Sequence, residues 1–256
     1  IFEEMGIGPF QIRINNRRLL QGLLEHIGLS TDDQVNLAMR IVDNLEKVPL
    51  ERTKADLAAA GLADTAVDLL VSLFQEPESA DSALRALQAL DIENETFLQG
   101  LGELTDVVAA IRSLGVPDNR FIVDPRIARG LDYYTGTVYE TRLLDHPQLG
   151  SICSGGRYDD LTSLFTKKKF PGVGISIGLG RLAPKLMEAG LVDTSRTTIA
   201  QVLVTAADQT RILDYMGLGK TLRDAGIATE VFIEPKKLGA QMKYAAAKGF
   251  RYAVIA

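Results

Sequence analysis

The first two elements of the chain are marked by a change in the spacing of its apolar residues. Between residues 11 and 15, isoleucine alternates with polar residues, which is the period of a strand with one buried face. From residue 17 onward, leucines recur at the three- and four-residue spacing of an amphipathic helix. Asn15 or Asn16 can cap that helix. The pattern predicts a strand from Gln11 to Asn15 that leads directly into a helix.

Residues 31 to 113 are predicted to be almost wholly helical. They are rich in alanine and leucine at helical spacing, and the runs are interrupted at Pro49, Gly61 and Pro77. Between residues 30 and 110, sixteen residues are Asp or Glu and five are Lys or Arg. This acidic stretch contains no recognisable chemical motif, so we interpret it as scaffold.

The spacing changes twice more along the chain. After Pro117, short β-rich runs separated by turns predict a mostly antiparallel sheet, and they read RFIVDPRIARG, GTVYETRLL, GSICSG and GVGISIGLG. From Ile199 to the end, apolar runs and helical runs alternate as β-α-β-α-β, which is the pattern of a parallel α/β unit. Residues 189 to 198 indicate a linker between the two parts.

The amino-acid composition indicates a globular protein and argues against several other classes of protein. The 256 residues are 46% hydrophobic and 24% charged, as in globular proteins. Cys153 has no second cysteine with which to form a disulfide, and His26 and His146 lie far apart, which argues against a zinc site. No apolar run approaches the roughly 20 residues that span a bilayer. The start has no signal peptide and no initiator methionine, so we expect the middle of a larger protein.

Two runs place arginine and tyrosine together in the predicted sheet. The run ARGLDYYTGTVYET, residues 128 to 141, holds Arg129 and two adjacent tyrosines. Such residues pack well on sheet faces, but they also suit a binding site that a sheet holds rigid. The run SICSGGRYDDL sets two glycines before an arginine and a tyrosine. Taken alone, this run is better explained as a glycine hairpin or loop with a helix cap at Asp159 or Asp160.

A third run, GVGISIGLGRL, predicts a strand with one face almost without side chains. In strand register, one face carries Val173, Ile175, Ile177 and Leu179, and the other carries Gly172, Gly174, Ser176, Gly178 and Gly180. Such a face is costly unless something lies flat against it. Tight packing is one explanation. We favour a flat heteroaromatic ring such as a purine, because Arg181 follows at once.

The residue types available limit the chemistry. Arg129 and Arg181 suit phosphate, because the planar guanidinium binds two oxygens and keeps its charge. Histidine is almost absent, so no Ser-His-Asp or Cys-His set can form. Phosphoryl or adenylyl transfer, which relies on positioning and charge, fits this inventory.

The motifs resemble those of a known family. RGLDYYTGTVYE and SGGRYDDL resemble the two signature motifs of histidyl-tRNA synthetase, and GVGISIGLGRL resembles the third motif of class II aminoacyl-tRNA synthetases. The run from Val231 to Ala256 resembles the early part of that family's anticodon-binding domain. The resemblance covers nearly the whole chain. The first two motifs are specific to this family and its paralogues, whereas class II enzymes share the third.

This resemblance implies an α+β fold: part of an antiparallel-sheet class II synthetase catalytic core with a helical insertion, followed by a partial α/β anticodon-binding domain. The catalytic part would span residues 1–190, with the insertion at about 30–113. The anticodon-binding part would span residues 199–256. The family's first two class II motifs would precede residue 1, so we expect a fragment with a partial site and little or no aminoacylation activity alone.

The resemblance also implies a histidine pocket. Tyr133 and Tyr134 would line it, and Tyr158 would lie at the imidazole. Gly155 and Gly156 would leave room for the ring. The substrate would be L-histidine.

For ATP, the resemblance implies a second set of residues. Arg129 would lie against the α-phosphate and stabilise charge as the histidine carboxylate attacks. Arg181 would hold the triphosphate, and the glycine face that includes Gly178 and Gly180 would lie under the adenine. Mg²⁺ would accompany ATP, and no metal would be bound by the protein itself.

The resemblance finally implies that tRNA(His) is a partner, that the full-length protein is a homodimer, and that it is cytoplasmic without a membrane. From residue 199 onward, eight Lys or Arg against five Asp or Glu permit contact with tRNA phosphates. Two alternatives are a histidine-binding regulatory paralogue, the regulatory subunit of ATP phosphoribosyltransferase, and a non-catalytic synthetase-like module that senses tRNA. The β-α-β-α-β segment argues against the first, and the intact motifs argue against the second.

Overall fold

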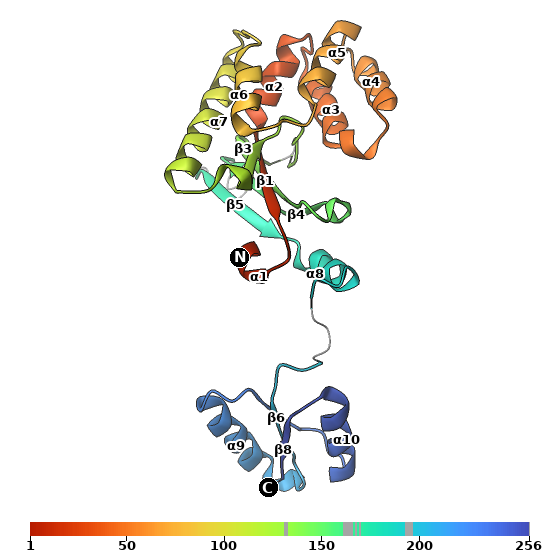
Figure 1. Ribbon diagram of the computed structural model, residues 1–256, viewed down its shortest axis with the longest axis vertical. Coiled ribbons are helices and arrows are strands. Elements are labelled where there is room, and N and C mark those ends of the chain that lie inside the picture. The colour runs from red at the N-terminus through yellow and green to blue at the C-terminus, as the bar shows by residue number, and fades with distance from the viewer. Residues whose placement is uncertain (131–132, 161–165, 167, 169, 193–196, 256) are drawn as a thin grey trace. The chain divides into compact units, whose positions relative to one another are not determined.

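The computed structural model describes residues 1–130, 133–160, 166, 168, 170–192 and 197–255, and of Arg181 only the backbone. The chain divides into two compact units, Ile1–Lys185 and Leu186–Ala256 (Figure 1). The division falls a few residues before the predicted linker at 189–198, part of which lies outside the described residues. Among the described helices, none combines the length and apolar character needed to cross a membrane.

The first unit contains a mixed, mostly antiparallel sheet. Its five strands lie in the order β2-β1-β3-β4-β5, and β1 pairs in parallel with β2 while the other pairs are antiparallel. The strands are β1 (Phe10–Asn16), β2 (Phe121–Val123), β3 (Thr137–Leu143), β4 (Ser151–Tyr158) and β5 (Gly172–Ile177). This confirms the prediction of a mostly antiparallel sheet and adds β1 to its interior.

The stretch from 31 to 113 is helical, as predicted. The described α-helices up to the division are α1 (Phe2–Met5), α2 (Arg17–His26), α3 (Asp32–Asp43), α4 (Leu50–Ala59), α5 (Asp64–Leu73), α6 (Ala80–Gln88), α7 (Glu95–Ser113) and α8 (Leu179–Glu188), the last of which runs across the division. Short 3₁₀ helices include η1 at Leu45–Lys47. The breaks fall at the predicted Pro49, Gly61 and Pro77. The side chain of Asn16 accepts a hydrogen bond from the amide of Arg18, so Asn16 is the cap of α2.

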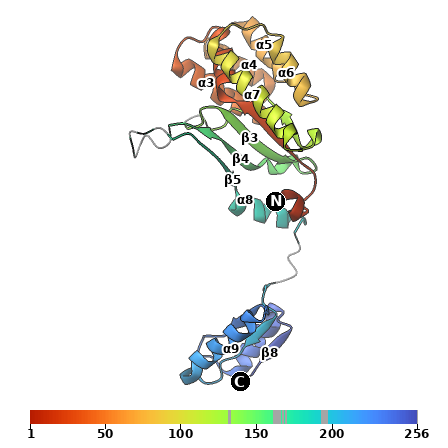
Figure 2. The same ribbon diagram turned by 90° about the vertical axis from the view of Figure 1, so that its left-hand side faces the viewer.

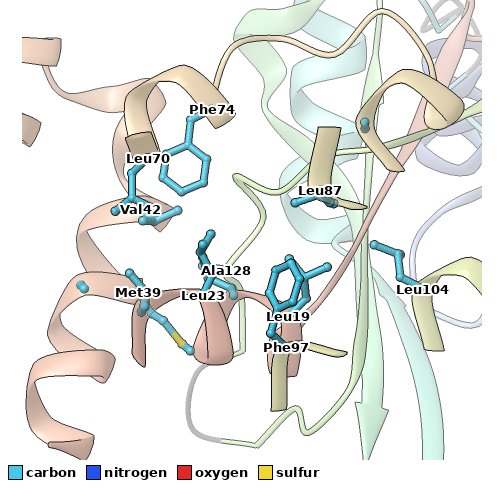
Figure 3. Packing of buried hydrophobic residues seen from close by; sticks show 14 of the residues in the cluster. Leu19, Leu23, Met39, Val42, Leu70, Phe74, Leu87, Phe97, Leu104 and Ala128 are labelled. Carbon is cyan, nitrogen blue, oxygen red and sulfur yellow. The ribbon is translucent and has the colours of Figure 1, made fainter. Parts of the chain in front are cut away.

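The main hydrophobic core lies among these helices. Figures 1 and 2 show α2 to α7 gathered beside the sheet, apart from α1 and α8. Figure 3 shows side chains from α2, α3, α5, α6 and α7 packing together with Ala128. Ile14, Phe121 and Val123 join the same core from strands β1 and β2. Ala128 directly precedes Arg129, so the segment that carries this arginine is anchored in the helical core.

Helices α2 and α7 meet almost backbone to backbone. A Cβ added at Gly100 on α7 would lie 2.2 Å from the amide nitrogen of Leu19 on α2, and one added at Gly22 on α2 would lie 2.2 Å from the amide nitrogen of Phe97. Glycine is therefore required on both sides of the crossing. Because α2 follows β1 directly, this contact fixes the helical segment against the sheet.

Replacing Gly100 by alanine should lower the free energy of unfolding by about 2 to 3 kcal/mol, because the new methyl group must push two helix backbones apart. The matched control is Gly102→Ala on the same helix, where nothing lies within 4 Å of the added carbon. That change should raise stability by roughly 0.5 to 1 kcal/mol, since alanine is the better helix former. Chemical denaturation of both variants measures the difference, and equal stabilities would contradict the tight crossing.

The second unit is a small parallel α/β fold, as predicted from residue 199 onward. Its three strands lie in the order β7-β6-β8, and both pairs are parallel. The elements are β6 (Val202–Val204), α9 (Ile212–Asp224), β7 (Thr229–Val231), α10 (Leu238–Lys248) and β8 (Tyr252–Val254). Gln241 on α10 is fully buried, and its amide group bonds both the nitrogen and the carbonyl oxygen of Ala206, which ties α10 to the end of β6.

Candidate active site

One face of the five-stranded sheet carries a row of polar side chains. The register pairs Arg13 on β1 with Glu140 on β3, Glu140 with Ser154 on β4, and Ser154 with Ser176 on β5. Residues paired in this way point to the same side of a sheet. We call this side the polar face; the opposite side carries the apolar row through Ile14 and Tyr139.

Arg129 lies beside the polar face and is held by carboxylates. It forms an ion pair with Glu140, whose side chain is 1% exposed, and a longer one of 3.9 Å with Asp43 at the end of α3. The arginine side chain itself is 32% exposed. In both ion pairs the nearest nitrogen is Nε. Arg129 therefore meets its carboxylates through the inner nitrogen of its guanidinium group.

Four arginines and five carboxylates form a charged cluster around this point: Arg13, Arg126, Arg129, Arg142, Asp43, Glu46, Glu76, Asp124 and Glu140. Several of them line a polar pocket. Asp43, Glu46 and Glu76 come from the helical stretch that the sequence suggested was only scaffold. The structure adds to this interpretation, because these carboxylates, far apart along the helical stretch, converge on arginines of the sheet and of the segment that follows β2.

Asp124 is the buried centre of one half of the cluster. Its carboxylate accepts hydrogen bonds of 2.8 and 2.9 Å from Arg126 and one of 2.8 Å from Arg13. Burial alone would raise the pKa of Asp124, but the hydrogen bonds and charge of Arg126, with the charge of Arg13, outweigh it and lower the pKa. Asp124 therefore stays ionised and locks two arginines in place.

The backbone that leads to Arg129 is held by β1. The buried side-chain amide of Asn15 donates to the carbonyl oxygens of Pro125 at 3.1 Å and Ile127 at 2.8 Å. The amide of Asp124 bonds the carbonyl of Ile14. Residues 124–128 form few backbone hydrogen bonds among themselves. The contacts with β1 and the burial of Ala128 therefore fix the position of the backbone that leads to Arg129.

Tyr134 lies over two glycines on the polar face. A Cβ at Gly130 would lie 1.9 Å from its ring and one at Gly156 would lie 2.8 Å from it, so both positions must stay without side chains. The ring of Tyr133 packs on that of Tyr134 with centroids 4.3 Å apart, and Tyr133 is 49% exposed. Burial first, and then the hydrogen bond with Tyr133, raise the pKa of Tyr134 to about 12. The phenol is thus neutral at physiological pH.

Tyr158 covers the glycine-rich face of β5. Its ring carbon Cε2 would lie 2.4 Å from a Cβ at Gly172, and Cε1 would lie 3.6 Å from one at Gly174. The flat group that the sequence predicted against this face is, at these two glycines, a tyrosine of the protein. Gly155 points to the opposite side, where a Cβ would lie 2.2 Å from the carbonyl oxygen of Gly174.

The predicted strand from 172 to 180 is too long. Strand β5 ends at Ile177, and α8 begins at Leu179, because the amide of Leu182 already bonds the carbonyl of Gly178 in helical fashion. Gly178 and Gly180 therefore belong to the strand-to-helix turn. Nothing lies within 4 Å of a Cβ at Gly180. Arg181 lies in the first turn of α8, and its side chain is outside the described part of the chain.

The two tyrosine-bearing motifs are joined by hydrogen bonds. Thr135 donates its hydroxyl to the carboxylate of Asp159 at 2.8 Å, and its amide bonds the carbonyl of Arg157. Asp159 also accepts from the guanidinium of Arg157 at 3.0 Å. These contacts hold Tyr134 and Tyr158 on the same side of the sheet, together with Arg129.

Comparison with known proteins agrees with the motifs. The family model described as Histidyl-tRNA synthetase matches residues 1–182, which is well over half of the chain. The chain belongs to the histidyl-tRNA synthetase family. Class II histidyl-tRNA synthetase structures share its fold, so the α+β assignment with a partial antiparallel-sheet core is confirmed.

The relatives within the histidyl-tRNA synthetase family are close. The chain is 44% identical over 262 residues to the Histidine--tRNA ligase of Xanthomonas oryzae pv. oryzae (strain PXO99A), covering 100% of this chain and 56% of that protein. It is 43% identical over 258 residues to that of Nostoc punctiforme, covering 100% of this chain and 55% of that protein. The chain therefore spans about half the length of the curated relatives that it matches.

Solved structures show the same likeness. The crystal structure of histidyl-tRNA synthetase from Nostoc sp. PCC 7120 is 41% identical, with a TM-score of 0.79 over 100% of this chain and 60% of that chain. A structure from Bacillus halodurans C titled ATP phosphoribosyltransferase regulatory subunit/histidyl-tRNA synthetase has a TM-score of 0.63 at 18% identity, covering 98% of this chain and 60% of that chain, and shows the fold alone.

Sequence reasoning placed Arg129, Tyr134 and Tyr158 on the strands of one sheet. Only Tyr158 is on a strand, β4, whereas Arg129 and Tyr134 lie between β2 and β3, with their side chains against the same face of the sheet. Sequence reasoning did not identify Glu140 and Asp43, the two carboxylates that form ion pairs with Arg129. A signal for Glu140 was present, because it is an acidic residue within the otherwise apolar and β-branched run GTVYETRLL. No comparable signal marks Asp43, which is one acidic residue among many on a helical stretch.

Proposed function

We propose that the protein of which this chain forms part is a histidine–tRNA ligase, which activates histidine with ATP and transfers it to tRNA(His). The observation that carries this proposal is the placement of Arg129, Tyr134 and Tyr158 on one face of a sheet in a chain of the histidyl-tRNA synthetase family. The sheet carries Tyr158 directly, and it supports Arg129 through Glu140 and Tyr134 through Gly156. A site for two substrates requires such rigid support.

Arg129 would act in the first step of the reaction. A carboxylate oxygen of histidine would attack the α-phosphorus of ATP, the bond to the β-phosphate oxygen would break, and pyrophosphate would leave. Negative charge on the α-phosphate oxygens would be stabilised by the planar guanidinium group, which binds two oxygens and stays charged. Gly178, Gly180 and Arg181 complete the proposed ATP site, and the open space at Gly180 supports close approach of the nucleotide.

The tyrosines would recognise histidine. Tyr134 is neutral at physiological pH, as an ordinary tyrosine is, and its pKa of about 12 keeps it so in more alkaline solution. Its hydroxyl can therefore donate a hydrogen bond to the substrate. We place Tyr133 and Tyr158 in the same pocket, with Tyr158 at the imidazole. Gly156 belongs to the pocket wall, and in this structure the ring of Tyr134 lies over it. Gly155 faces the opposite side of the sheet, so it would serve the pocket only by allowing β4 and β5 to pack closely behind it.

The remaining assignments follow from the same proposal. Residues 1–190 would form part of the catalytic domain, with the helical insertion at about 30–113, and residues 199–256 would form part of an anticodon-binding domain that contacts tRNA(His). Mg²⁺ would arrive with ATP as part of the substrate. In the described residues, no group of three His, Cys, Asp or Glu side chains could hold a metal ion by itself. A homodimer and a cytoplasmic location stay predictions for the full-length protein.

The regulatory paralogue is less well supported. The curated relatives at 43 and 44% identity are named Histidine--tRNA ligase, whereas the structure whose title includes the regulatory subunit is 18% identical. The second unit, with its parallel strands β6, β7 and β8, also favours the synthetase. The tRNA-sensing alternative is also less well supported. A non-catalytic module would be expected to have lost the catalytic motifs, and this chain retains them.

The test is ATP–pyrophosphate exchange with the full-length protein that contains this chain. We expect exchange with histidine and none with any other amino acid, followed by charging of tRNA(His). Saturable binding of histidine without any exchange would instead support the regulatory paralogue. Binding of uncharged tRNA without histidine-dependent exchange would support the sensing module.

A further inference from the structure

Glu140 is one of the most deeply buried charged residues of the described chain. It lies in the middle of β3, paired with Arg13 on one side and Ser154 on the other, and its side chain is 1% exposed. One carboxylate oxygen, Oε2, meets Nε of Arg129, and the other, Oε1, meets Nε of Arg142. Each carboxylate oxygen of Glu140 therefore contacts the guanidinium group of a different arginine.

The pair Glu140–Arg129 is unequal in rigidity. Glu140 is fixed by strand pairing on both sides of β3, whereas Arg129 lies between β2 and β3, where the described residues 124–130 and 133–136 form neither helix nor strand. A buried carboxylate also needs its positive partners, because an uncompensated charge in the interior is costly. The strand residue therefore determines where the guanidinium lies.

The direction of this contact matters for phosphate binding. The nearest nitrogen of Arg129 to Glu140 is Nε, and among the described residues Arg129 donates no hydrogen bond from its two terminal nitrogens. The other arginines of the charged cluster differ, since Arg13, Arg126 and Arg142 each donate a terminal nitrogen to a carboxylate. Glu140 thus takes the inner nitrogen and leaves the pair of donors that matches two phosphate oxygens.

Asp43 is a weaker candidate for the same role. It lies 3.9 Å from Nε of Arg129, beyond hydrogen-bonding distance, and its side chain is 27% exposed. Its attraction to Arg129 is more strongly screened by water than that of Glu140. A partly exposed carboxylate at this distance adds charge but does not fix the orientation of the guanidinium group.

We propose that Glu140 is the positioning residue of Arg129, which holds its guanidinium group so that the two terminal nitrogens face the α-phosphate during histidine activation. The proposal rests on the proposed function. It assigns to Glu140 no contact with substrate, and its effect on the reaction passes entirely through Arg129.

The test is a double-mutant cycle in the full-length protein, read by histidine-dependent ATP–pyrophosphate exchange. Glu140→Gln keeps the shape of the side chain and removes its charge. We expect it to lower kcat on the order of 10- to 100-fold, as loss of an orienting group does elsewhere, with KM for histidine unchanged. In an Arg129→Ala background, the same change should alter kcat by less than about twofold, because the residue through which it acts is gone.

The matched control is Glu46→Gln. Glu46 belongs to the same cluster and forms ion pairs with Arg13, Arg126 and Arg142, whereas the ion pairs of Arg129 within the cluster are with Glu140 and Asp43. Glu46→Gln should leave kcat within about twofold of the unmodified protein. An equal loss of kcat in Glu46→Gln and Glu140→Gln would mean that kcat falls whenever the cluster is disturbed, which would overturn a specific role for Glu140. An equal loss of kcat from Glu140→Gln in both backgrounds would refute action through Arg129.

If Glu140→Gln does not fold, Glu140→Asp replaces it in both backgrounds with the same criteria, since the shorter carboxylate keeps the charge but moves it away from Arg129. Unchanged kcat in a folded Glu140 variant overturns the proposal. The proposed function fails in a different way, through absence of histidine-dependent exchange in the unmodified protein, so the two failures are distinct.

Discussion

Replacing Arg129 by alanine is expected to lower the kcat of histidine-dependent ATP–pyrophosphate exchange on the order of 10²- to 10³-fold, or about 3 to 4 kcal/mol of transition-state stabilisation. The guanidinium group is proposed to meet charge that develops on the α-phosphate as pyrophosphate leaves. Arg129→Lys should restore only part of this loss, because an ammonium group is a point charge without the two-nitrogen fork. Steady-state exchange kinetics in the full-length protein measure both variants.

The matched control for this experiment is Arg112→Ala. Arg112 also pairs with carboxylates, Asp81 and Asp118, but it lies at the end of α7. Its loss should leave kcat unchanged. A wild-type kcat in Arg129→Ala would exclude Arg129 from the transition state and would direct attention to Arg181, whose side chain the structure does not describe.

Replacing Asp124 by asparagine is expected to destabilise the fold by about 3 to 5 kcal/mol, because the change leaves two buried arginines without their central counter-charge. The side chain of Asp124 is 1% exposed and bonds both Arg126 and Arg13. Urea denaturation at neutral pH measures the difference. Asp81→Asn is the control, since it removes an ion pair with Arg112 at the surface, where little change is expected.

The effect of Asp124→Asn should depend on pH in a defined direction. The folded-state pKa of Asp124 is lowered relative to the unfolded chain. Its contribution to stability is therefore complete above the unfolded pKa of about 3.9 and declines as the pH falls through the lower, folded-state pKa. The difference between Asp124→Asn and the unmodified protein should shrink in acid, and a difference that is constant down to strongly acidic pH would contradict the ion-pair explanation.

The order of elements could be predicted because their hydrophobic periods differ. Isoleucines alternating before Asn16 and leucines at helical spacing after it describe β1 and α2 closely. The prediction failed at the end of β5, where alternation continues in sequence to Gly180 although the backbone has already turned into α8. The spacing of residues could not reveal where the strand ends, because glycine is common both in a closely packed strand and in the turn that follows it. Alternating glycines therefore do not distinguish the two.

The site was predicted only in part, for a different physical reason. Arg129 and the tyrosines lie in contiguous motifs, so their residue types alone suggested a function. Their carboxylate partners come from distant segments, with Asp43 at the end of α3 and Glu140 on β3. Such partners depend on the tertiary packing of α2 on α7 and on strand register, and neither is encoded in the spacing of a single run.

The position of β1 in the sheet has a consequence for how the chain folds during translation. Both neighbours of β1 in the sheet, β2 and β3, follow the whole helical stretch in sequence. As the ribosome releases the chain, both edges of β1 therefore stay unpaired until β2 has emerged at Val123, and one edge stays unpaired until β3 has emerged at Leu143. Unpaired edges favour aggregation. The crossing of α2 on α7 through Gly22 and Gly100 can form earlier, and it shortens the loop that β1 and β3 must close. We expect nascent chains in which this crossing is disrupted to depend on chaperones even where the finished protein is stable.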